Sequence, residues 1–343
     1  METISPGRLK TTYLFNQSFA SLLKLLPEGK VVIVTDDHVY KAQQEKFSNI
    51  PVITVPSGEA TKQQKTVDDI IAALLKLQAD KSTVIVAVGG GVVTDMAGYA
   101  ASIYKRGVRL ALAPTSILAM VDAAVGGKNG VDVGLYKNMV GTVYQPEYIL
   151  FDYHFLSTLP QEEWVNGFAE IIKHACIKDA ALFEELSNTS LSFYQHDPAR
   201  LASLVERNVR IKKVIVEEDE FETGDRKLLN FGHTVGHAIE NVHHLPHGHA
   251  ISVGMVIAAT LSEELAGLPM GDTRRLITLL NAYGLTTAVK FNLDTIWEIL
   301  LMDKKRANDS MNFILLRAIG DGIIMPIPLT QLKALITAYL ERS

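Results

Sequence analysis

Residues 83–103 read TVIVAVGGGVVTDMAGYAASI: a β-branched run that ends in three glycines and passes into a helical pattern from Val92. A strand, a glycine turn and a helix in this order are typical of α/β sheets, where backbone N–H groups at the helix start can hold a pyrophosphate. Taken alone, the glycine turn is a weak nucleotide signal, because Thr94 stands where the G-x-G-x-x-G fingerprint ends on glycine. The alternative is that three small residues let a helix pack closely on a sheet.

The sequence on both sides of this stretch repeats the same rhythm. Short β-branched or apolar runs predict buried parallel strands at Val31–Thr35, Val52–Val55 and Leu110–Ala113. Apolar residues at helical spacing predict an amphipathic helix over Thr61–Gln78, with Thr61 as its N-cap. Strands that alternate with helices indicate a doubly wound, Rossmann-like α/β domain.

The strand rhythm stops near Thr158, and the second half predicts a mostly α-helical domain. Helical patterns cover Pro160–Lys178, Ala199–Val216, Lys227–Val242, Ala250–Ala266 and Thr273–Tyr283, and a hairpin is expected from Asn312–Arg317 through a turn at 320–322 towards Ile323. We therefore expect an α/β domain over residues 1–158 and a helical domain over residues 159–343.

The composition argues against several classes of protein and limits the side chains that could bind a metal. The chain has 343 residues, with 33 Lys and Arg against 38 Asp and Glu, so its net charge of −5 argues against a nucleic-acid binder that relies on a general positive field. Cys176 is the only cysteine, so any metal must be held by His, Asp or Glu. No run approaches about 18 apolar residues and the N-terminus lacks a signal-peptide layout, so we expect a cytoplasmic protein without membrane contact.

Histidines gather in one segment of the second half. Six of the ten lie between His233 and His249, and His233 and His237 stand four apart on a predicted helix, hence on one face. Upstream, Glu170 shares a helix face with Lys173 and His174. One Glu and two His would leave a coordination position open, as catalytic zinc requires. The alternative is an intrahelical Glu–Lys pair and solvated loop histidines.

Basic residues form a third group, several of them beside glycine turns. As a set they indicate a site for an anionic small molecule, although each alone is more often a solvated surface charge. The group comprises Arg106, Lys128, Lys137, Lys173, Lys212, Arg226, Lys304 and Lys305.

Several long motifs in register carry a family resemblance. They are GGGVVTDMAGYAASIYKRGVR (89–109), APTSILAMVDAAVGGKNGVD (113–132), KNMVGTVYQP (137–146), NGFAEIIKHACI (166–177) and LLNFGHTVGHAIE (228–240). In order and spacing the chain resembles the 3-dehydroquinate synthase family over roughly residues 30–325.

The resemblance implies an activity and its cofactors. Members convert an anionic sugar phosphate, 3-deoxy-D-arabino-heptulosonate 7-phosphate (DAHP), to 3-dehydroquinate and phosphate in the shikimate route to chorismate and aromatic amino acids. They use NAD⁺ catalytically and one divalent metal, usually zinc, with cobalt as an alternative. The reaction oxidises the substrate transiently, eliminates phosphate, returns the hydride and closes the ring by an aldol step.

The resemblance also assigns site residues. The implied metal ligands are Glu170, His233 and His247, which gives His237 a role at the substrate instead. The implied NAD⁺ contacts are Asp36, Glu59, Lys62, Gly89, Gly90, Gly91, Asp95, Thr115, Ser116, Lys128 and Lys137. The positions implied around the substrate are Arg106, Asp122, Lys128, Lys137, Asn138, Lys173, Lys212, Arg226, Asn230, His237, and Lys304 or Lys305.

The chain departs from the family pattern at two positions. Ser116 stands where a second Thr is common, and His249 stands where the family usually has Glu.

The resemblance also implies an oligomeric state and leaves two rival functions. The residue equivalent to Arg106 reaches the neighbouring subunit's site in this family, which implies a homodimer. The rivals are another sugar phosphate cyclase and a metal-dependent polyol dehydrogenase, and Lys212, Arg226 and Asn230 favour a carboxylate-bearing substrate.

Overall fold

The computed structural model describes residues 2–4, 11–134, 136–301, 306–307 and 309–342. By its internal contacts the chain divides into two compact units, the first from residues 1–164 and 198–220, the second from residues 165–197 and 221–343. Among the described helices, none combines the length and the apolar character needed to cross a bilayer. The boundary expected at residues 158 and 159 stays a prediction.

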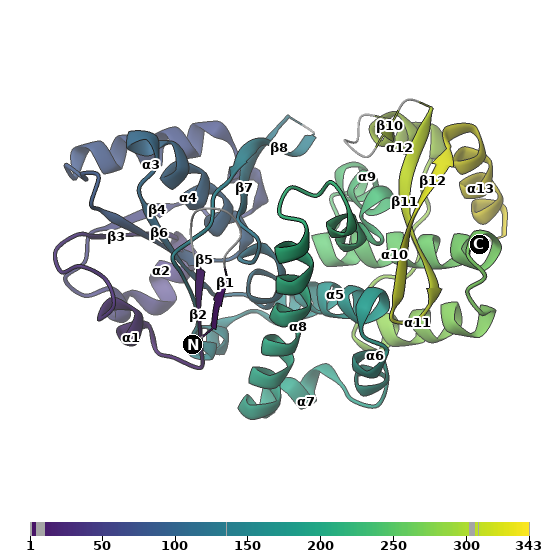
Figure 1. The fold of residues 1–343 in the computed structure, drawn as a ribbon, viewed down its shortest axis with the longest axis horizontal. Helices are drawn as coiled ribbons and strands as arrows, with labels where there is room; N and C mark the ends of the chain where they lie inside the picture. The colour runs from purple at the N-terminus through teal and green to yellow at the C-terminus, as the bar shows by residue number, and fades with distance from the viewer. Residues whose placement is uncertain (1, 5–10, 135, 302–305, 308, 343) are drawn as a thin grey trace. The chain divides into compact units, whose positions relative to one another are not determined.

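The first unit is built on a seven-stranded sheet in the order β1-β2-β9-β6-β5-β3-β4 (Figure 1). Strand β1 pairs antiparallel with β2, and all the other neighbours in this sheet are parallel. The strands are β1 Glu2–Ile4, β2 Thr11–Phe15, β3 Val31–Asp36, β4 Val52–Val55, β5 Val84–Gly89, β6 Arg109–Pro114 and β9 Tyr148–Phe151. The parallel sheet and its helices confirm the α/β, Rossmann-like prediction for this half.

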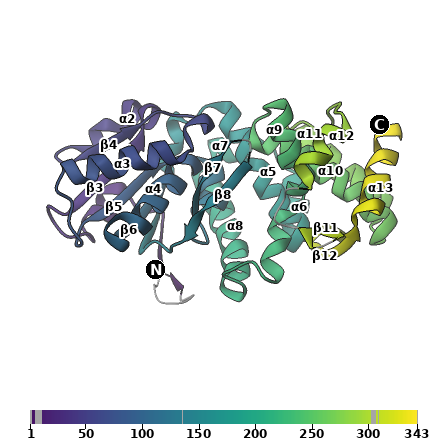
Figure 2. The same cartoon turned by 90° about the horizontal axis from the view of Figure 1, so that it is seen from above.

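Both faces of the sheet are covered, which explains why its central strands read as continuous apolar runs. On one face Val84, Val86 and Val88 share a buried cluster with Phe19 and Leu22 of α1 (Phe19–Leu23). Because side chains alternate along a strand, Ile85 and Ala87 face the other side, where α4 (Gly91–Ile103) contacts β5 and packs beside α3 (Gln64–Lys76) (Figure 2).

The remaining elements of the first unit surround this sheet. They are α2 (Asp37–Gln43), α8 (Pro198–Glu218), the antiparallel hairpin of β7 (Lys128–Val133) and β8 (Tyr136–Val143), the short helices η1 (Gln44–Phe47), η2 (Glu59–Thr61), η3 (Tyr104–Arg106) and η5 (Tyr153–Thr158), and the π-helical turn η4 (Ala119–Ala123).

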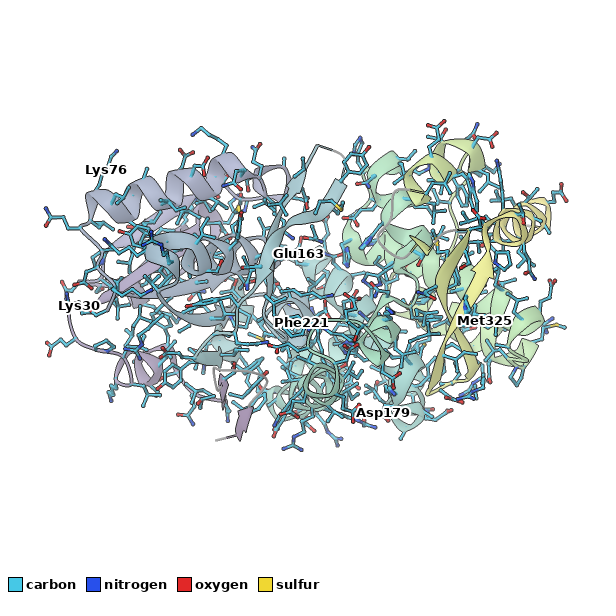
Figure 3. All side chains as sticks on the ribbon, turned by 45° about the horizontal axis from the view of Figure 1, so that its top comes forward. Lys30, Lys76, Glu163, Asp179, Phe221 and Met325 are labelled. Carbon is cyan, nitrogen blue, oxygen red and sulfur yellow. The ribbon has the colours of Figure 1, made fainter. Side chains whose placement is uncertain are left out.

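The second unit is mostly helical, which confirms the prediction for the second half. Its helices are α5 (Gln161–Lys178, which starts in the first unit), α6 (Ala180–Ser187), α7 (Leu191–His196), η6 (Asp225–Asn230), α9 (His233–His243), α10 (His247–Leu265), α11 (Met270–Ala282), α12 (Leu293–Leu300) and α13 (Leu329–Arg342). A small sheet joins β10 (Arg306–Ala307), β11 (Ser310–Ala318) and β12 (Asp321–Pro328), which includes the expected hairpin. Local caps fix the helix starts, as where Asp179 (Figure 3) accepts a hydrogen bond from the Leu182 amide to begin α6.

Three of the predicted helices are wrong in detail. Helix α3 begins after Gln63, and the Thr61 hydroxyl donates to the carbonyls of Pro56 and Gly58 instead of capping the helix. The helix expected over Lys227–Val242 is two elements, because Gly232 adopts a left-handed φ of 79° between η6 and α9. Helix α10 begins at His247, three residues earlier than expected, so its first turn carries two of the clustered histidines.

Candidate active site

Two of the expected nucleotide-binding features of the first unit, Asp36 and the glycine turn, lie where the strand order changes direction. From β3 the chain continues to β4 on one side, whereas β5 and β6 follow on the other side. Asp36 ends β3, and Gly89 ends the neighbouring strand β5. In open α/β sheets, ligands bind outside the carboxyl ends of the strands at such a switch point, so the fold presents this edge for a nucleotide.

The glycine turn requires its small residues. A Cβ on Gly89 would lie 2.5 Å from Cβ of Val93, which no real Cβ tolerates. A Cβ on Gly90 would lie 3.6 Å from Oγ of Ser116, and the Thr115 amide donates to the Gly89 carbonyl at 2.9 Å. The turn and the Thr115–Ser116 pair therefore adjoin, as expected for residues that share one cofactor.

Asp36, at this edge of the sheet, also caps the helix that follows it. One of its carboxylate oxygens accepts a hydrogen bond from the Val39 amide at 2.8 Å and so caps α2. Burial raises the pKa of Asp36 and outweighs the opposing hydrogen bond from Val39.

Charged residues form a connected network beside the turn. The Lys62 ammonium lies 2.6 Å from the Asp95 carboxylate and donates to Oδ1 of Asn138 at 2.6 Å. Lys137 pairs with Glu59 at 2.7 Å. Burial alone would lower the pKa of Lys62, but the attraction of Asp95 and Glu59 outweighs it and raises that pKa. Lys62 is therefore a fixed cation, and five expected site residues meet in this network.

Asp132 belongs to the same network, although the sequence analysis did not single it out. Its Oδ1 accepts from the Asn138 amide at 2.7 Å, its own amide donates to the Lys62 carbonyl at 2.9 Å, and its other carboxylate oxygen lies 3.6 Å from Nζ of Lys137. Asp132 thus ties the β7–β8 hairpin to the segment that carries Lys62. An isolated Asp in a strand gives no sequence signal for this role.

A second basic group of the first unit surrounds the turn before β7. The Lys212 ammonium, on α8, donates to both Oδ1 and the backbone carbonyl of Asp122 at 2.6 Å. Gly126 and Gly127 have left-handed φ values of 103° and 67°, and they lead to the exposed Lys128 at the start of β7.

Arg106 lies in an unusual loop of the first unit. Lys105, Arg106 and Gly107 have consecutive left-handed φ values of 48°, 60° and 102°. The Lys81 ammonium donates to the carbonyls of Lys105 and Arg106 at 3.1 and 3.3 Å, and also to that of Gly107. Two non-glycine residues in this region cost roughly 1–2 kcal/mol each, and Lys81 offsets part of that cost by holding the carbonyls together.

In the second unit, the structure brings together the three expected metal ligands, which we call the Glu–His triad: Glu170 of α5, His233 of α9 and His247 of α10. Oε1 of Glu170 lies 3.4 Å from Nε2 of His247 and 3.6 Å from Nε2 of His233. Glu170 is fully buried and His233 is 7% exposed, so these groups are held in the interior.

Glycines set the distance between the two histidine helices. A Cβ on Gly254 of α10 would lie 1.9 Å from the carbonyl oxygen of Gly232, which directly precedes α9. A Cβ on Gly248 would lie 2.2 Å from the carbonyl oxygen of Asn166 on α5. The three elements that carry the Glu–His triad therefore approach backbone to backbone, and no larger residue fits at these points.

Hydrogen bonds orient both imidazoles towards Glu170. Nδ1 of His233 lies 3.1 Å from the Phe231 carbonyl oxygen, an acceptor, so this nitrogen carries the proton and Nε2 is left with its lone pair. Nδ1 of His247 lies 3.3 Å from Oε2 of Glu240. Burial alone would lower the pKa of His247, but the neighbouring carboxylates of Glu170 and Glu240 outweigh burial and raise that pKa to about 10.

The Glu–His triad fits a divalent cation. One carboxylate and two imidazoles are a common catalytic zinc donor set, which leaves a coordination position open. Among the described residues, Oε1 of Glu170 finds no hydrogen-bond partner although it is fully buried. Burial would raise the pKa of Glu170, but the neighbouring Lys173, His233 and His247 hold it well below its usual range, so an anionic oxygen faces both Nε2 atoms.

The other expected residues of this unit that the structure describes lie on α5, α9 and η6. Lys173 forms a buried ion pair with Glu170, so the intrahelical pair and the Glu–His triad are both present. The His237 ring centroid lies 5.1 Å from that of His233 and 6.0 Å from that of His247. Arg226 is 1% exposed, and Asn230 donates a hydrogen bond to Glu222. Lys304 and Lys305 lie outside the described residues.

His249, the residue that departs from the family pattern, lies outside the Glu–His triad. Its Nδ1 lies 2.9 Å from Oγ1 of Thr286, and it accepts from the Thr286 amide at 3.3 Å. It therefore connects α10 to the segment after α11, and His247 is the member of the pair that joins the triad.

The fold and the triad together define a class: an α/β protein with a dinucleotide-type sheet and a helical unit that can hold a catalytic divalent metal. Family models for the N-terminal and C-terminal parts of 3-dehydroquinate synthase match residues 52–166 and 167–306. The chain belongs to the 3-dehydroquinate synthase family.

Individual relatives agree with this assignment. The 3-dehydroquinate synthase of Saccharolobus solfataricus is 40% identical over 95% of this chain and 94% of its own length. That of Campylobacter concisus is 38% identical over 88% of this chain and 89% of its own. A solved 2-deoxy-scyllo-inosose synthase, complexed with carbaglucose-6-phosphate, NAD⁺ and Co²⁺, is 28% identical, with a TM-score of 0.83 over 96% of both chains.

Proposed function

We propose that this protein is an NAD- and metal-dependent lyase that converts DAHP to 3-dehydroquinate and phosphate, in the route to chorismate and the aromatic amino acids. The observation that carries the proposal is the Glu–His triad, which lies inside the region matched by the C-terminal family model. The family's relatives at 36–40% identity bear the same activity in their names.

Two groups would supply chemistry that the side chains lack. When bound, NAD⁺ accepts and later returns a hydride, and zinc, or cobalt in its place, polarises the alcohol that is oxidised. We assign the metal to Glu170, His233 and His247. The NAD⁺ contacts are assigned to Asp36, Glu59, Lys62, Asp95, Thr115, Ser116 and the Gly89–Gly91 turn, with Lys128 and Lys137 shared between cofactor and substrate.

The remaining side chains bind and orient the substrate. We assign Asp122, Asn138, Lys173, Lys212, Arg226, Asn230 and His237 to this role. Cations fixed by ion pairs, such as Lys212 on the half-buried Asp122, need little reorganisation to hold a phosphate or a carboxylate. They hold the substrate in a reactive conformer, while the substrate's own phosphate oxygens can take the proton during elimination.

The two rival functions rank lower. The sugar phosphate cyclase of solved structure is 28% identical, against 40% for the Saccharolobus relative. The likeness to a probable glycerol dehydrogenase, at 15% identity and a TM-score of 0.62, concerns the fold alone. A homodimer in which Arg106 serves the neighbouring site and a cytoplasmic location both stay predictions.

Substrate comparison and one pair of variants test the proposal. The zinc-loaded protein should turn over DAHP at least about 100-fold faster, by kcat/KM, than sedoheptulose 7-phosphate, which lacks the carboxylate, because a site built for a charged group strongly rejects an analogue without it. Arg226→Ala should impair turnover while calorimetry shows unchanged NAD⁺ affinity, whereas Lys128→Ala, at a position shared with the cofactor, should impair turnover and also weaken NAD⁺ binding. Preference for sedoheptulose 7-phosphate, or steady NADH production from a polyol, would refute the proposed substrate.

A further inference from the structure

His247 stands between two carboxylates. Its Nε2 lies 3.4 Å from Oε1 of Glu170, and its Nδ1 lies 3.3 Å from Oε2 of Glu240. Glu240 is 8% exposed, so its carboxylate has given up most of its contact with water. A neutral imidazole offers one lone pair and one N–H, so the two nitrogens of His247 cannot play the same part.

Two groups of potential metal ligands share this histidine. One is the Glu–His triad, and the other comprises His237, Glu240 and His247. His233 decides between them, because the Phe231 carbonyl occupies its Nδ1 and turns its Nε2 towards Glu170. If Glu240 plays the same part for His247, both Nε2 lone pairs converge on Oε1 of Glu170.

We propose that Glu240 is a positioning residue: it accepts the Nδ1–H of His247 and thereby holds the Nε2 lone pair of that histidine towards Glu170 and His233. This inference rests on the proposed metal-dependent function and adds to it a residue that is not a ligand. A metal-bound histidine usually donates its second N–H to a carboxylate or carbonyl, which fixes its tautomer and increases its strength as a donor.

The spacing on α9 makes this arrangement possible. His233, His237 and Glu240 stand at positions i, i+4 and i+7 and therefore share one face of the helix. The same face supplies one ligand, His233, and holds another, His247 of α10, in place. Glu240 thus links the two helices at the site, in addition to their close approach at Gly254.

The test measures metal binding instead of turnover. The full-length, metal-free chain is titrated with Zn²⁺ against a chromophoric chelator, and the visible absorption spectrum of the Co²⁺ form reports the ligand geometry. Glu240→Gln and Glu240→Ala are compared with the wild type and with Glu264→Gln, a matched change at an exposed position of α10. Circular dichroism and thermal melting show whether each variant is folded.

We expect zinc affinity to fall about 10-fold in Glu240→Gln, whose amide oxygen still accepts a hydrogen bond, and up to about 100-fold in Glu240→Ala. The Co²⁺ spectrum should shift in both variants, and Glu264→Gln should match the wild type. Unchanged zinc affinity and spectrum in both Glu240 variants would overturn the inference. So would loss of zinc binding in Glu240→Gln together with its retention in Glu170→Gln, because Glu240 would then be a ligand itself.

The outcome is separable from that of the proposed function. A wild-type protein that binds zinc but releases no phosphate from DAHP would refute the proposed activity and leave these affinities measurable. Normal wild-type turnover with no metal defect in the Glu240 variants would refute this inference alone.

Discussion

Replacing Gly254 with Ala tests whether close helix packing sets the metal site. The new Cβ would lie 1.9 Å from the Gly232 carbonyl oxygen, a deficit of about 1.5 Å against the 3.4 Å at which ordinary contact begins in a close-packed interior. The obstacle is backbone, so the relief must come from movement of α10 against α9. His233 follows Gly232 directly, and His247 starts α10, so this movement separates two members of the Glu–His triad.

The expected losses follow from these distances. Overpacking of this kind costs about 1–3 kcal/mol of stability. Metal sites keep ligand distances within ~0.2 Å, so a shift of a substantial fraction of 1.5 Å should lower zinc affinity at least about 10-fold.

Urea unfolding and zinc titration against a chelator measure the two effects. Gly271→Ala on α11 is the matched control, since its Cβ would meet nothing within 4 Å and should be neutral or stabilising by up to about 1 kcal/mol. If Gly254→Ala keeps both the wild-type urea midpoint and the wild-type zinc affinity, the packing argument is wrong.

Three further perturbations probe the first unit. Asp36→Asn keeps a good helix cap but loses the charge, so NAD⁺ should bind about 10-fold more weakly by fluorescence titration. Burial raises the pKa of Asp36, so the Asp36 carboxyl takes up a proton more readily in the folded wild type than in the unfolded chain. Acidification should therefore weaken NAD⁺ binding, while the contribution of Asp36 to the free energy of unfolding rises. The same pH dependence of NAD⁺ affinity in Asp36→Asn would contradict the assignment. Lys81→Met should release the Arg106 loop and raise KM for DAHP about 10-fold, a cost of roughly 1.4 kcal/mol. In the double variant, Lys81→Met should raise KM little beyond the effect of Arg106→Ala alone. Fully additive effects on KM would show that Lys81 does not act through Arg106. Lys62→Met leaves the Asp95 carboxylate without its ion-pair partner and should cost about 3 kcal/mol in urea unfolding, whereas an unchanged midpoint would show that the pair contributes nothing.

Local sequence patterns predicted four of the seven strands of this sheet, β3 to β6, and the central ones are easy to find because they are buried on both faces. The runs at Val31–Thr35, 83–88 and Leu110–Ala113 owe their apolar character to that burial, so a short window of sequence is enough to find them. Strand β8 was missed for the opposite reason. Most of its residues are exposed, and they show no alternation that would mark a half-buried strand.

Sequence patterns could not predict which segments far apart in the chain pack against each other. Periodicity predicted one helix over Lys227–Val242, but the break at Gly232 is set by the carbonyl that abuts Gly254 more than 20 positions away. Glu240 was missed because a single carboxylate on an amphipathic helix is usually solvated. The Glu–His triad was accessible only through the family resemblance, since spacing alone favoured His237 over His247 as the partner of His233.

The most direct test of the proposed activity is the stoichiometry of phosphate and NADH when the zinc-loaded protein acts on DAHP with catalytic NAD⁺. The account predicts one phosphate and one 3-dehydroquinate for each substrate consumed, no net NADH, and loss of both products when a chelator removes the metal. Accumulation of NADH in proportion to substrate, or turnover without phosphate release, would contradict it.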